Sequence, residues 1–170
     1  MDGLRHSLFV PATSSFFLVV GVATAIKEQV KTRYAAKDDN GKPLYEHPYR
    51  PWIELDPKYK EQGDRAWRAF KMCENVKEWT VFSMPLVWII AMFGSSLPYV
   101  EDSYVNYFLA ATSVLYAYAN HQFIFGYLES PEKRLKGFKL RILVFRLWLL
   151  GSGLSLLGYG LTTAAAKLSA

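Results

Sequence analysis

The chain has 170 residues, of which 51% are hydrophobic, 16% aromatic and 21% charged, with a formal net charge of +5. The length allows one domain, and because no recognition motif accompanies the basic residues, we expect no nucleic-acid partner. The single cysteine, Cys73, excludes an internal disulfide and a cysteine-rich metal site, and we predict no bound metal.

The charged residues lie between long apolar stretches instead of being spread along the chain. Residues 8–26, 79–100 and 103–128 contain no Lys, Arg, Asp or Glu, and residues 138–161 contain Lys139, Arg141 and Arg146. Each stretch is close to the roughly 20 residues that a helix needs to cross a bilayer. We therefore predict a single all-α domain over residues 1–170, an integral membrane four-helix bundle. Its helices are expected at about 8–26, 65–97, 104–128 and 131–161, with a loop at 27–64.

The first apolar stretch has an alternative interpretation as a cleaved signal peptide over residues 1–25. Basic residues precede it, and Ala23-Thr24-Ala25 resembles a signal-peptidase site. Pro11 and three hydroxyl residues at 13–15 make a poor apolar core for a signal peptide. We therefore expect the stretch to be retained as a spanning helix.

The basic residues predict how the helices are oriented. Eleven Lys and Arg residues lie between Lys27 and Lys71, and four lie in the turn at 129–139. The connection at 98–103 has no basic residue. By the positive-inside rule, loops 27–75 and 129–139 face the cytoplasm, and both termini lie on the other side.

The connections carry helix start and stop signals. Residues 34–59 contain four prolines and several aromatic residues, which argue against a long helix and against plain disorder. An ordered cap over the bundle and an interfacial segment both fit this composition. Asp64 is a candidate N-cap for the second helix. Ser130-Pro131-Glu132 predicts the start of the fourth helix and places Arg134 in its first turn.

Polar residues recur on one face of the second predicted helix. Lys71, Asn75 and Glu78 are four and three residues apart, so they share a helix face. A carboxylate at the edge of an apolar span is costly without a partner. The simplest interpretation of Glu78 is an ion pair with Lys77, Lys71, Arg141 or the deeper Arg146.

A second polar group lies where the third helix passes into the fourth. Phe123 and Tyr127 are four residues apart on one face, and Arg134 follows them. Tyr127 alone fits an aromatic belt residue of a membrane interface. Together, however, cations, a carboxylate, an amide and a phenol gather at one membrane face. Such a site suits a small zwitterionic or anionic ligand that brings its own nucleophile, because the chain has no Ser-His-Asp set, metal cluster or phosphate loop.

This junction resembles that of a known membrane family. The segment His121-Gln122-Phe123-Ile124-Phe125-Gly126-Tyr127, followed by Glu129, Lys133-Arg134 and Gly137-Phe138-Lys139-Leu140, is similar to the third-to-fourth helix junction of the MAPEG family, the membrane-associated proteins in eicosanoid and glutathione metabolism. The nearest subgroup is that of microsomal glutathione transferase 2 and leukotriene C4 synthase. Asn75-Val76-Lys77-Glu78 is a weaker match to the family's Asn-x-x-Glu.

The resemblance implies a homotrimer in the endoplasmic reticulum or nuclear membrane, with the co-substrate glutathione bound between subunits near the cytoplasmic face. It assigns activation of the glutathione thiol to Arg134. It also implies a lipophilic electrophile or fatty-acid-like lipid as the second ligand. By position, the glutathione-binding residues are Lys71, Asn75, Glu78, Tyr127, Arg33 and Phe123.

The expected function is therefore a membrane glutathione transferase that joins the glutathione thiolate to a lipophilic electrophile, either leukotriene C4 synthase-like or detoxifying. The chain departs from the family pattern at Phe123, where the nearest enzymes have tyrosine, and at Lys71-Met72-Cys73, where they have Arg-Ala-Gln. Its first connection is also longer. Phe123 and the altered Lys71-Met72-Cys73 segment favour the alternative of a non-catalytic lipid-binding scaffold resembling the 5-lipoxygenase-activating protein.

Overall fold

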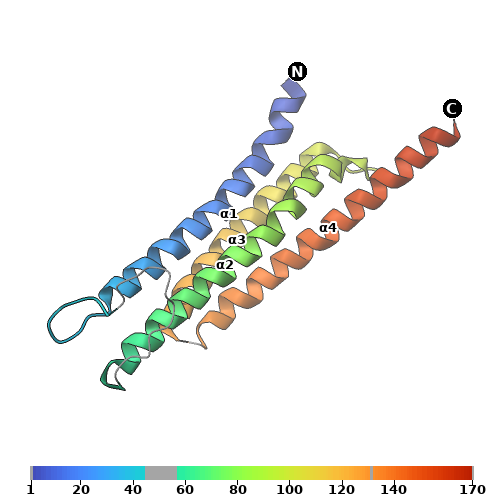
Figure 1. The fold of residues 1–170 in the computed structure, drawn as a ribbon. Coiled ribbons are helices and arrows are strands. Elements are labelled where there is room, and N and C mark those ends of the chain that lie inside the picture. The colour runs from blue at the N-terminus through green and yellow to red at the C-terminus, as the bar shows by residue number, and fades with distance from the viewer. Residues whose placement is uncertain (1, 45–56, 131, 170) are drawn as a thin grey trace.

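A computed structural model describes residues 2–44, 57–130 and 132–169, with side chains from Phe9 onward. In these ranges the chain forms four long helices and two short 3-10 turns, so the all-α prediction is confirmed for the described residues. The helices run side by side in an elongated bundle, and both termini lie at the same end (Figure 1). The elements are α1 (Asp2–Ala35), η1 (Pro57–Tyr59), α2 (Lys60–Phe93), η2 (Gly94–Ser96), α3 (Asp102–Glu129) and α4 (Arg134–Leu168).

Three helical segments within the described residues are long and apolar enough to cross a membrane, namely Phe9–Ala35, Pro57–Ser96 and Arg134–Leu168. Helix α3 is long enough, with 28 residues and no charge between Asp102 and Glu129, but it is not apolar enough to be counted with these three. Asn120 and its neighbours His121 and Gln122 lower its average hydropathy. The bundle accommodates part of this polarity internally, because the side chain of Asn120 is only 2% exposed.

Helices α1 and α2 extend further than predicted toward the loop that connects them. Helix α1 continues from residue 26 to Ala35, and α2 begins at Lys60 instead of residue 65. The charged residues at 27–35 leave the apolar stretch, but most of them are good helix formers, so the change of polarity does not end the helix. The predicted N-cap, Asp64, therefore lies inside α2, which starts directly after the 3-10 turn at Pro57–Tyr59.

The fourth helix begins three residues later than predicted, at Arg134, and continues to Leu168 instead of ending at 161. The hydroxyl of Ser130 accepts the backbone N–H of Lys133 at 3.2 Å, so Ser130 has a capping role in the turn before the helix. Pro131 lies outside the described residues. Arg134 is in the opening turn, as predicted, and α3 ends at Glu129, where its end was expected.

Part of the first connection forms an ordered turn against the start of α2. One carboxylate oxygen of Asp38 accepts the backbone N–H groups of Asn40 at 2.9 Å and Lys42 at 2.8 Å, and Gly41 has a φ of 77°. Lys58 pairs with Asp39 at 2.8 Å and holds the pKa of that carboxyl below its usual value. The residues at 45–56, with Tyr45, Tyr49 and Trp52, lie outside the described residues, so both interpretations of this loop stay open.

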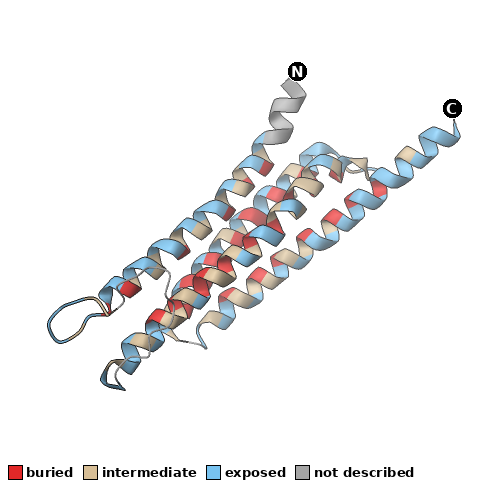
Figure 2. Ribbon diagram, viewed as in Figure 1, coloured by how far each residue is buried: buried red, intermediate tan, exposed pale blue. Residues whose placement is uncertain are grey.

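The core consists of the inner faces of the helices (Figure 2). Its larger cluster surrounds Trp148 of α4 and Tyr116 of α3, whose ring centroids are 5.0 Å apart. A second cluster contains Met72, Cys73 and Phe123 and lies nearer the end of the bundle where α1 is connected to α2. The outward faces carry many exposed Leu, Val and Phe side chains, which fits a bundle whose surroundings are apolar.

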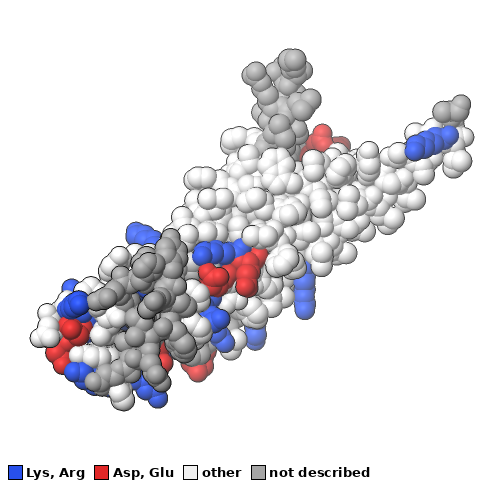
Figure 3. Space-filling model, in the orientation of Figure 1, with Lys and Arg blue, Asp and Glu red and all other residues white. Residues whose placement is uncertain are grey.

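Charged side chains gather at one end of the bundle, and a broad region beside them is almost free of charge (Figure 3). This end is formed by the last turns of α1 and α3 and the first turns of α2 and α4. The predicted segregation of charge is therefore a feature of the folded chain. We call this region the basic end; the side of the membrane that it faces stays a prediction.

Candidate functional site

The residues predicted to form the site come from all four helices, and all of them belong to the half of the bundle that holds the basic end. Five of the seven form two groups in the structure, and Arg33 and Phe123 lie outside both. The first is a row on the outward face of α2, and the second is a stacked pair at the junction of α3 and α4. The predicted site residues are Arg33, Lys71, Asn75, Glu78, Phe123, Tyr127 and Arg134.

The row on α2 faces away from the core. Lys71 and Glu78 are exposed and Asn75 is half-buried, whereas Met72 and Val76 between them are fully buried. The side-chain amide of Asn75 donates to the carbonyl of Lys71 at 2.8 Å. The row therefore presents an ammonium, an amide and a carboxylate to the surroundings of the chain.

Lys71 is positioned by aromatic residues of its own helix. Its ammonium lies 4.7 Å from the ring centroid of Trp67 and 6.0 Å from that of Phe70. A cation above an aromatic face is attracted by the ring quadrupole. Lys71 is thus held near the surface of α2, and no carboxylate among the described residues forms an ion pair with it.

The ion pairs considered for Glu78 do not form within the described part of the chain. Lys77 pairs with Glu74 at 2.9 Å, three residues apart on the helix, and none of the ion pairs between described residues includes Glu78. Arg141 points into the core, and Arg146 is exposed on α4 among leucines. The carboxylate of Glu78 therefore remains available to an external cation.

The second group is the stacked pair of Tyr127 and Arg134. The guanidinium carbon of Arg134 lies 4.7 Å from the ring centroid of Tyr127, whose side chain is 8% exposed. Arg134 is half-buried and makes no ion pair with any described residue. A fixed and partly exposed guanidinium at a membrane interface is suited to binding an anion.

Two glycines bring the backbones of α3 and α4 close enough for this stacking. A Cβ atom added at Gly126 would lie 2.6 Å from the carbonyl oxygen of Lys133, and one added at Gly137 would lie 2.6 Å from the Cα of Phe123. Both neighbours are backbone atoms, so neither can move aside easily. The glycines of the junction therefore determine how closely Arg134 approaches Tyr127.

Phe123 and Arg33, like Tyr127, expose little of their side chains in one chain. Phe123 is 2% exposed and lies behind Tyr127, with the two ring centroids 5.4 Å apart. Arg33 is 7% exposed in the last turn of α1. Close to it in the sequence, Lys31 helps to line a cavity of about 160 Å³ that also involves Gln62 and Arg65 of α2 and Leu128 of α3.

Arg141 was not among the predicted site residues, although it interrupts an apolar stretch of the sequence. The structure buries its side chain completely, with the guanidinium 4.4 Å from the ring centroid of Phe123. The available signal was a cation about two turns inside a predicted membrane helix, which is a functional hint in itself. Arg141 lies behind the site residues on the inner side of the bundle.

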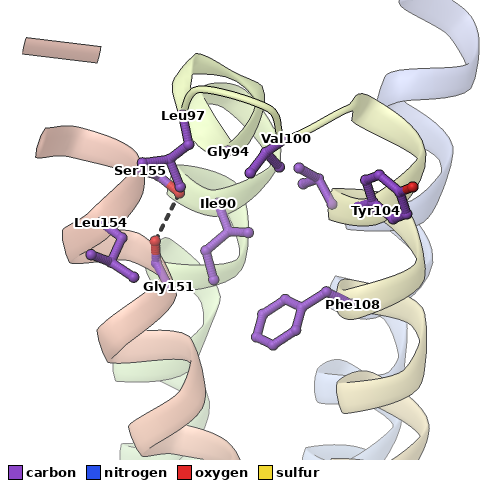
Figure 4. Close-up of a pocket in the computed structure, with 10 residues that line it drawn as sticks. Ile90, Gly94, Leu97, Val100, Tyr104, Phe108, Gly151, Leu154 and Ser155 are labelled. Atoms are coloured by element: carbon purple, nitrogen blue, oxygen red, sulfur yellow. Dashed lines mark hydrogen bonds between the residues drawn. The ribbon is translucent and has the colours of Figure 1, made fainter. Parts of the chain in front are cut away.

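An apolar pocket of about 240 Å³ lies far from the basic end, where η2 and the first turns of α3 meet α4. Ile90, Phe108 and Leu154 line it from three helices (Figure 4). None of the predicted site residues borders this pocket. Among the described residues, no group of three His, Cys, Asp or Glu side chains is arranged like a metal site.

Comparison with known proteins found a partial similarity. The chain is 28% identical over 80 residues to microsomal glutathione S-transferase 2 of Mus musculus. The aligned stretch covers 47% of this chain and 48% of that protein, so the match spans about half the length of the curated relative. No protein-family model matches the chain.

Proposed function

We propose that this chain is a membrane glutathione transferase of the MAPEG family, which conjugates glutathione to a lipophilic electrophile. The observation that carries the proposal is the stacked pair of Arg134 and Tyr127 at the basic end of an apolar helical bundle. The partial similarity to a microsomal glutathione transferase supports the same chemistry.

In this proposal Arg134 activates the glutathione thiol. A guanidinium beside the sulfur stabilises the thiolate and lowers the thiol pKa from about 8.5 toward neutrality. The thiol proton leaves to solvent, and the thiolate attacks the electrophilic carbon. A new carbon–sulfur bond forms as the bond to the leaving group breaks, or as an epoxide ring opens.

The remaining site residues suit the other charges of glutathione. The ligand carries two carboxylates and one ammonium, so the cations Lys71 and Arg33 match the carboxylates and Glu78 matches the ammonium. Asn75 supplies an amide, Tyr127 a phenol, and Phe123 supports Tyr127 from behind.

We propose that the chain assembles as a homotrimer, and the direction in which these groups face supports assembly with a neighbouring subunit. Lys71 and Glu78 lie on the outward face of α2, whereas Arg134 stacks at the junction of α3 and α4. Within the described part of one chain, no ion pair or cation–π contact joins the two groups. We propose that a neighbouring subunit brings them together, so that glutathione binds between subunits.

The proposed location is the endoplasmic reticulum or nuclear membrane, with loops 27–75 and 129–139 in the cytoplasm, where glutathione is supplied. The electrophile reaches the site from the bilayer. Leukotriene C4 synthesis and detoxification of lipophilic electrophiles are the two substrate classes that this arrangement serves.

Turnover with a model aryl halide, 1-chloro-2,4-dinitrobenzene, and with leukotriene A4 tests the proposal. The wild-type protein is expected to conjugate glutathione, and Arg134→Ala is expected to lose about 2–3 orders of magnitude in rate, a typical loss for a group that stabilises a reacting anion. Lys136→Ala removes an exposed cation two residues away and serves as the matched control. An Arg134→Ala rate equal to that of wild type would overturn the proposed mechanism.

A second candidate function is a non-catalytic lipid-binding scaffold. It is favoured by the burial of Phe123, which leaves no hydroxyl at a position where the nearest enzymes have one, and by Lys71 in place of arginine. Isothermal titration of the detergent-solubilised protein separates the two. The scaffold binds a fatty acid and no glutathione, whereas the transferase binds glutathione.

A further inference from the structure

Arg141 of α4 has an unusual environment for a charged residue. Its side chain is 0% exposed, and its Nε and Nη1 atoms are buried without a hydrogen-bond partner. None of the ion pairs in the described part of the chain includes it. A guanidinium stays protonated in proteins, so this is a buried and uncompensated positive charge.

The groups that surround Arg141 are aromatic rings, among them Tyr116 with its hydroxyl, and one backbone carbonyl. Its guanidinium carbon lies 4.4 Å from the ring centroid of Phe123, 5.5 Å from that of Trp79 and 5.8 Å from that of Tyr116. Its Nη2 donates a long hydrogen bond of 3.5 Å to the backbone carbonyl of Asn75. Cation–π attraction offsets part of the cost of burial but leaves the net charge unchanged.

No acidic side chain faces Arg141 from the helices that contact it. On α2, Glu74 is paired with Lys77 at 2.9 Å, and Glu78 is exposed on the outward face. On α3, Tyr116 is the titratable group in contact, and α4 contains no Asp or Glu. The field of Arg141 is therefore not cancelled locally.

This charge lies directly behind the proposed glutathione site. Arg141 contacts Asn75 and Phe123 from the inner side of the bundle. Seven residues separate it from Arg134, which corresponds to two helical turns, nearly the same face and about 10 Å along the axis. In the apolar part of a membrane bundle, charges at this separation interact more strongly than they would in water.

We infer that Arg141 is a positioning residue of the proposed glutathione site, whose uncompensated charge acts from behind Asn75 and Phe123 to favour the anionic form of the bound glutathione sulfur. The inference rests on the proposed function, which places the sulfur at Arg134. Arg141 itself touches neither substrate. The thiol proton leaves to solvent, and no further reactant is needed.

The test is a titration of thiolate absorbance with glutathione bound to the detergent-solubilised protein. A unit charge acting over about 10 Å, the axial separation of positions 134 and 141, at an effective dielectric constant of about 20 shifts a pKa by about one pH unit. In Arg141→Met, the thiolate is therefore expected to form at a pH about one unit higher than in wild type. Lys139→Met removes an exposed cation two residues away, where solvent and salt screen the charge, and its titration is expected to follow that of wild type.

A melting curve separates this role from a structural one. Replacing a buried unpaired cation by an apolar side chain of similar length removes a desolvation cost. Arg141→Met is therefore expected to melt at or above the wild-type temperature while its thiolate forms less readily. If Arg141→Met does not fold, Arg141→Gln provides the neutral variant and keeps a hydrogen-bond donor near Asn75.

Two results overturn the inference, and they are distinguishable. If wild type forms no bound thiolate, the proposed function fails and the inference fails with it. If wild type forms the thiolate and the neutral variant titrates at the same pH, only the inference fails. A lower melting temperature with an unchanged titration would assign Arg141 a purely structural role.

Discussion

At the junction of α3 and α4, the stacking of Arg134 on Tyr127 depends on two residues that lack a Cβ atom. Gly126 and Gly137 each face backbone of the opposite helix, so the absence of a Cβ atom allows the close approach. By contrast, Gly153 of α4 has nothing within 4 Å of its Cβ position. The same residue type therefore has different roles along one helix.

Gly137→Ala is expected to destabilise the protein and weaken glutathione binding. Its Cβ would lie 2.6 Å from the Cα of Phe123, and such overpacking costs about 1–3 kcal/mol. Thermal unfolding in detergent measures the change. Gly153→Ala is the matched control and is expected to melt at or above the wild-type temperature, since alanine is the better helix former. Equal melting curves for the two variants would contradict the close approach of the helices.

Trp148 provides a second prediction at this scale. Its indole N–H donates to the hydroxyl of Thr112 at 2.8 Å inside the core. Thr112→Val removes the acceptor and leaves a buried donor unsatisfied, which costs about 1–3 kcal/mol of unfolding free energy.

Thr80→Val is the control for Thr112→Val, because Thr80 is also buried and its hydroxyl bonds only to its own helix, at the carbonyl of Val76. We expect a clear drop in melting temperature for Thr112→Val and little change for Thr80→Val. A drop of the same size in both variants would show that loss of any buried hydroxyl, and not the bond to Trp148, is responsible.

At the scale of elements, the sequence predicts the four helices because apolar stretches and charge are separated so clearly. It misplaces several ends by three to nine residues, since a helix can extend past the apolar stretch that revealed it. Ala35 ends α1 well beyond residue 26, and Lys60 begins α2 before Asp64. Capping residues indicate where a helix is able to start, and only the folded chain selects among them.

The described turn of the first connection is expected to depend on Asp38. Its carboxylate accepts the N–H groups of Asn40 and Lys42, so Asp38→Ala removes both bonds. Amide hydrogen exchange at residues 38–44 should become faster, with the helices unaffected. Asp64→Ala changes an exposed carboxylate within α2 and should leave this turn unchanged. Exchange at 38–44 that is equally fast in wild type would show that the turn is not held by Asp38.

For the whole molecule, the gathering of charge at one end follows from the sequence, whereas the partners of individual charges do not. Glu74 takes Lys77, although Glu78 is the sequence neighbour of Lys77, because residues three apart face each other on a helix. The burial of Arg141 behind Phe123 depends on the packing of three helices. Such contacts are set by side-chain directions that a linear pattern does not contain.

The orientation of the basic end is testable by cysteine labelling in a Cys73→Ala background. Lys136 is exposed at the basic end, and Tyr99 is fully exposed near the opposite end. In sealed microsomes, an impermeant maleimide is expected to label Lys136→Cys directly and Tyr99→Cys only after permeabilisation. The reverse pattern would contradict the proposed cytoplasmic position of the loops.

The central claim is that glutathione binds at the basic end between neighbouring subunits. A cryo-electron microscopy map of the full chain with saturating glutathione tests it most directly. The account predicts a trimer with ligand density between Arg134 of one subunit and the row of Lys71, Asn75 and Glu78 on the next. A monomer, or a trimer whose interfaces carry no such density, would contradict it.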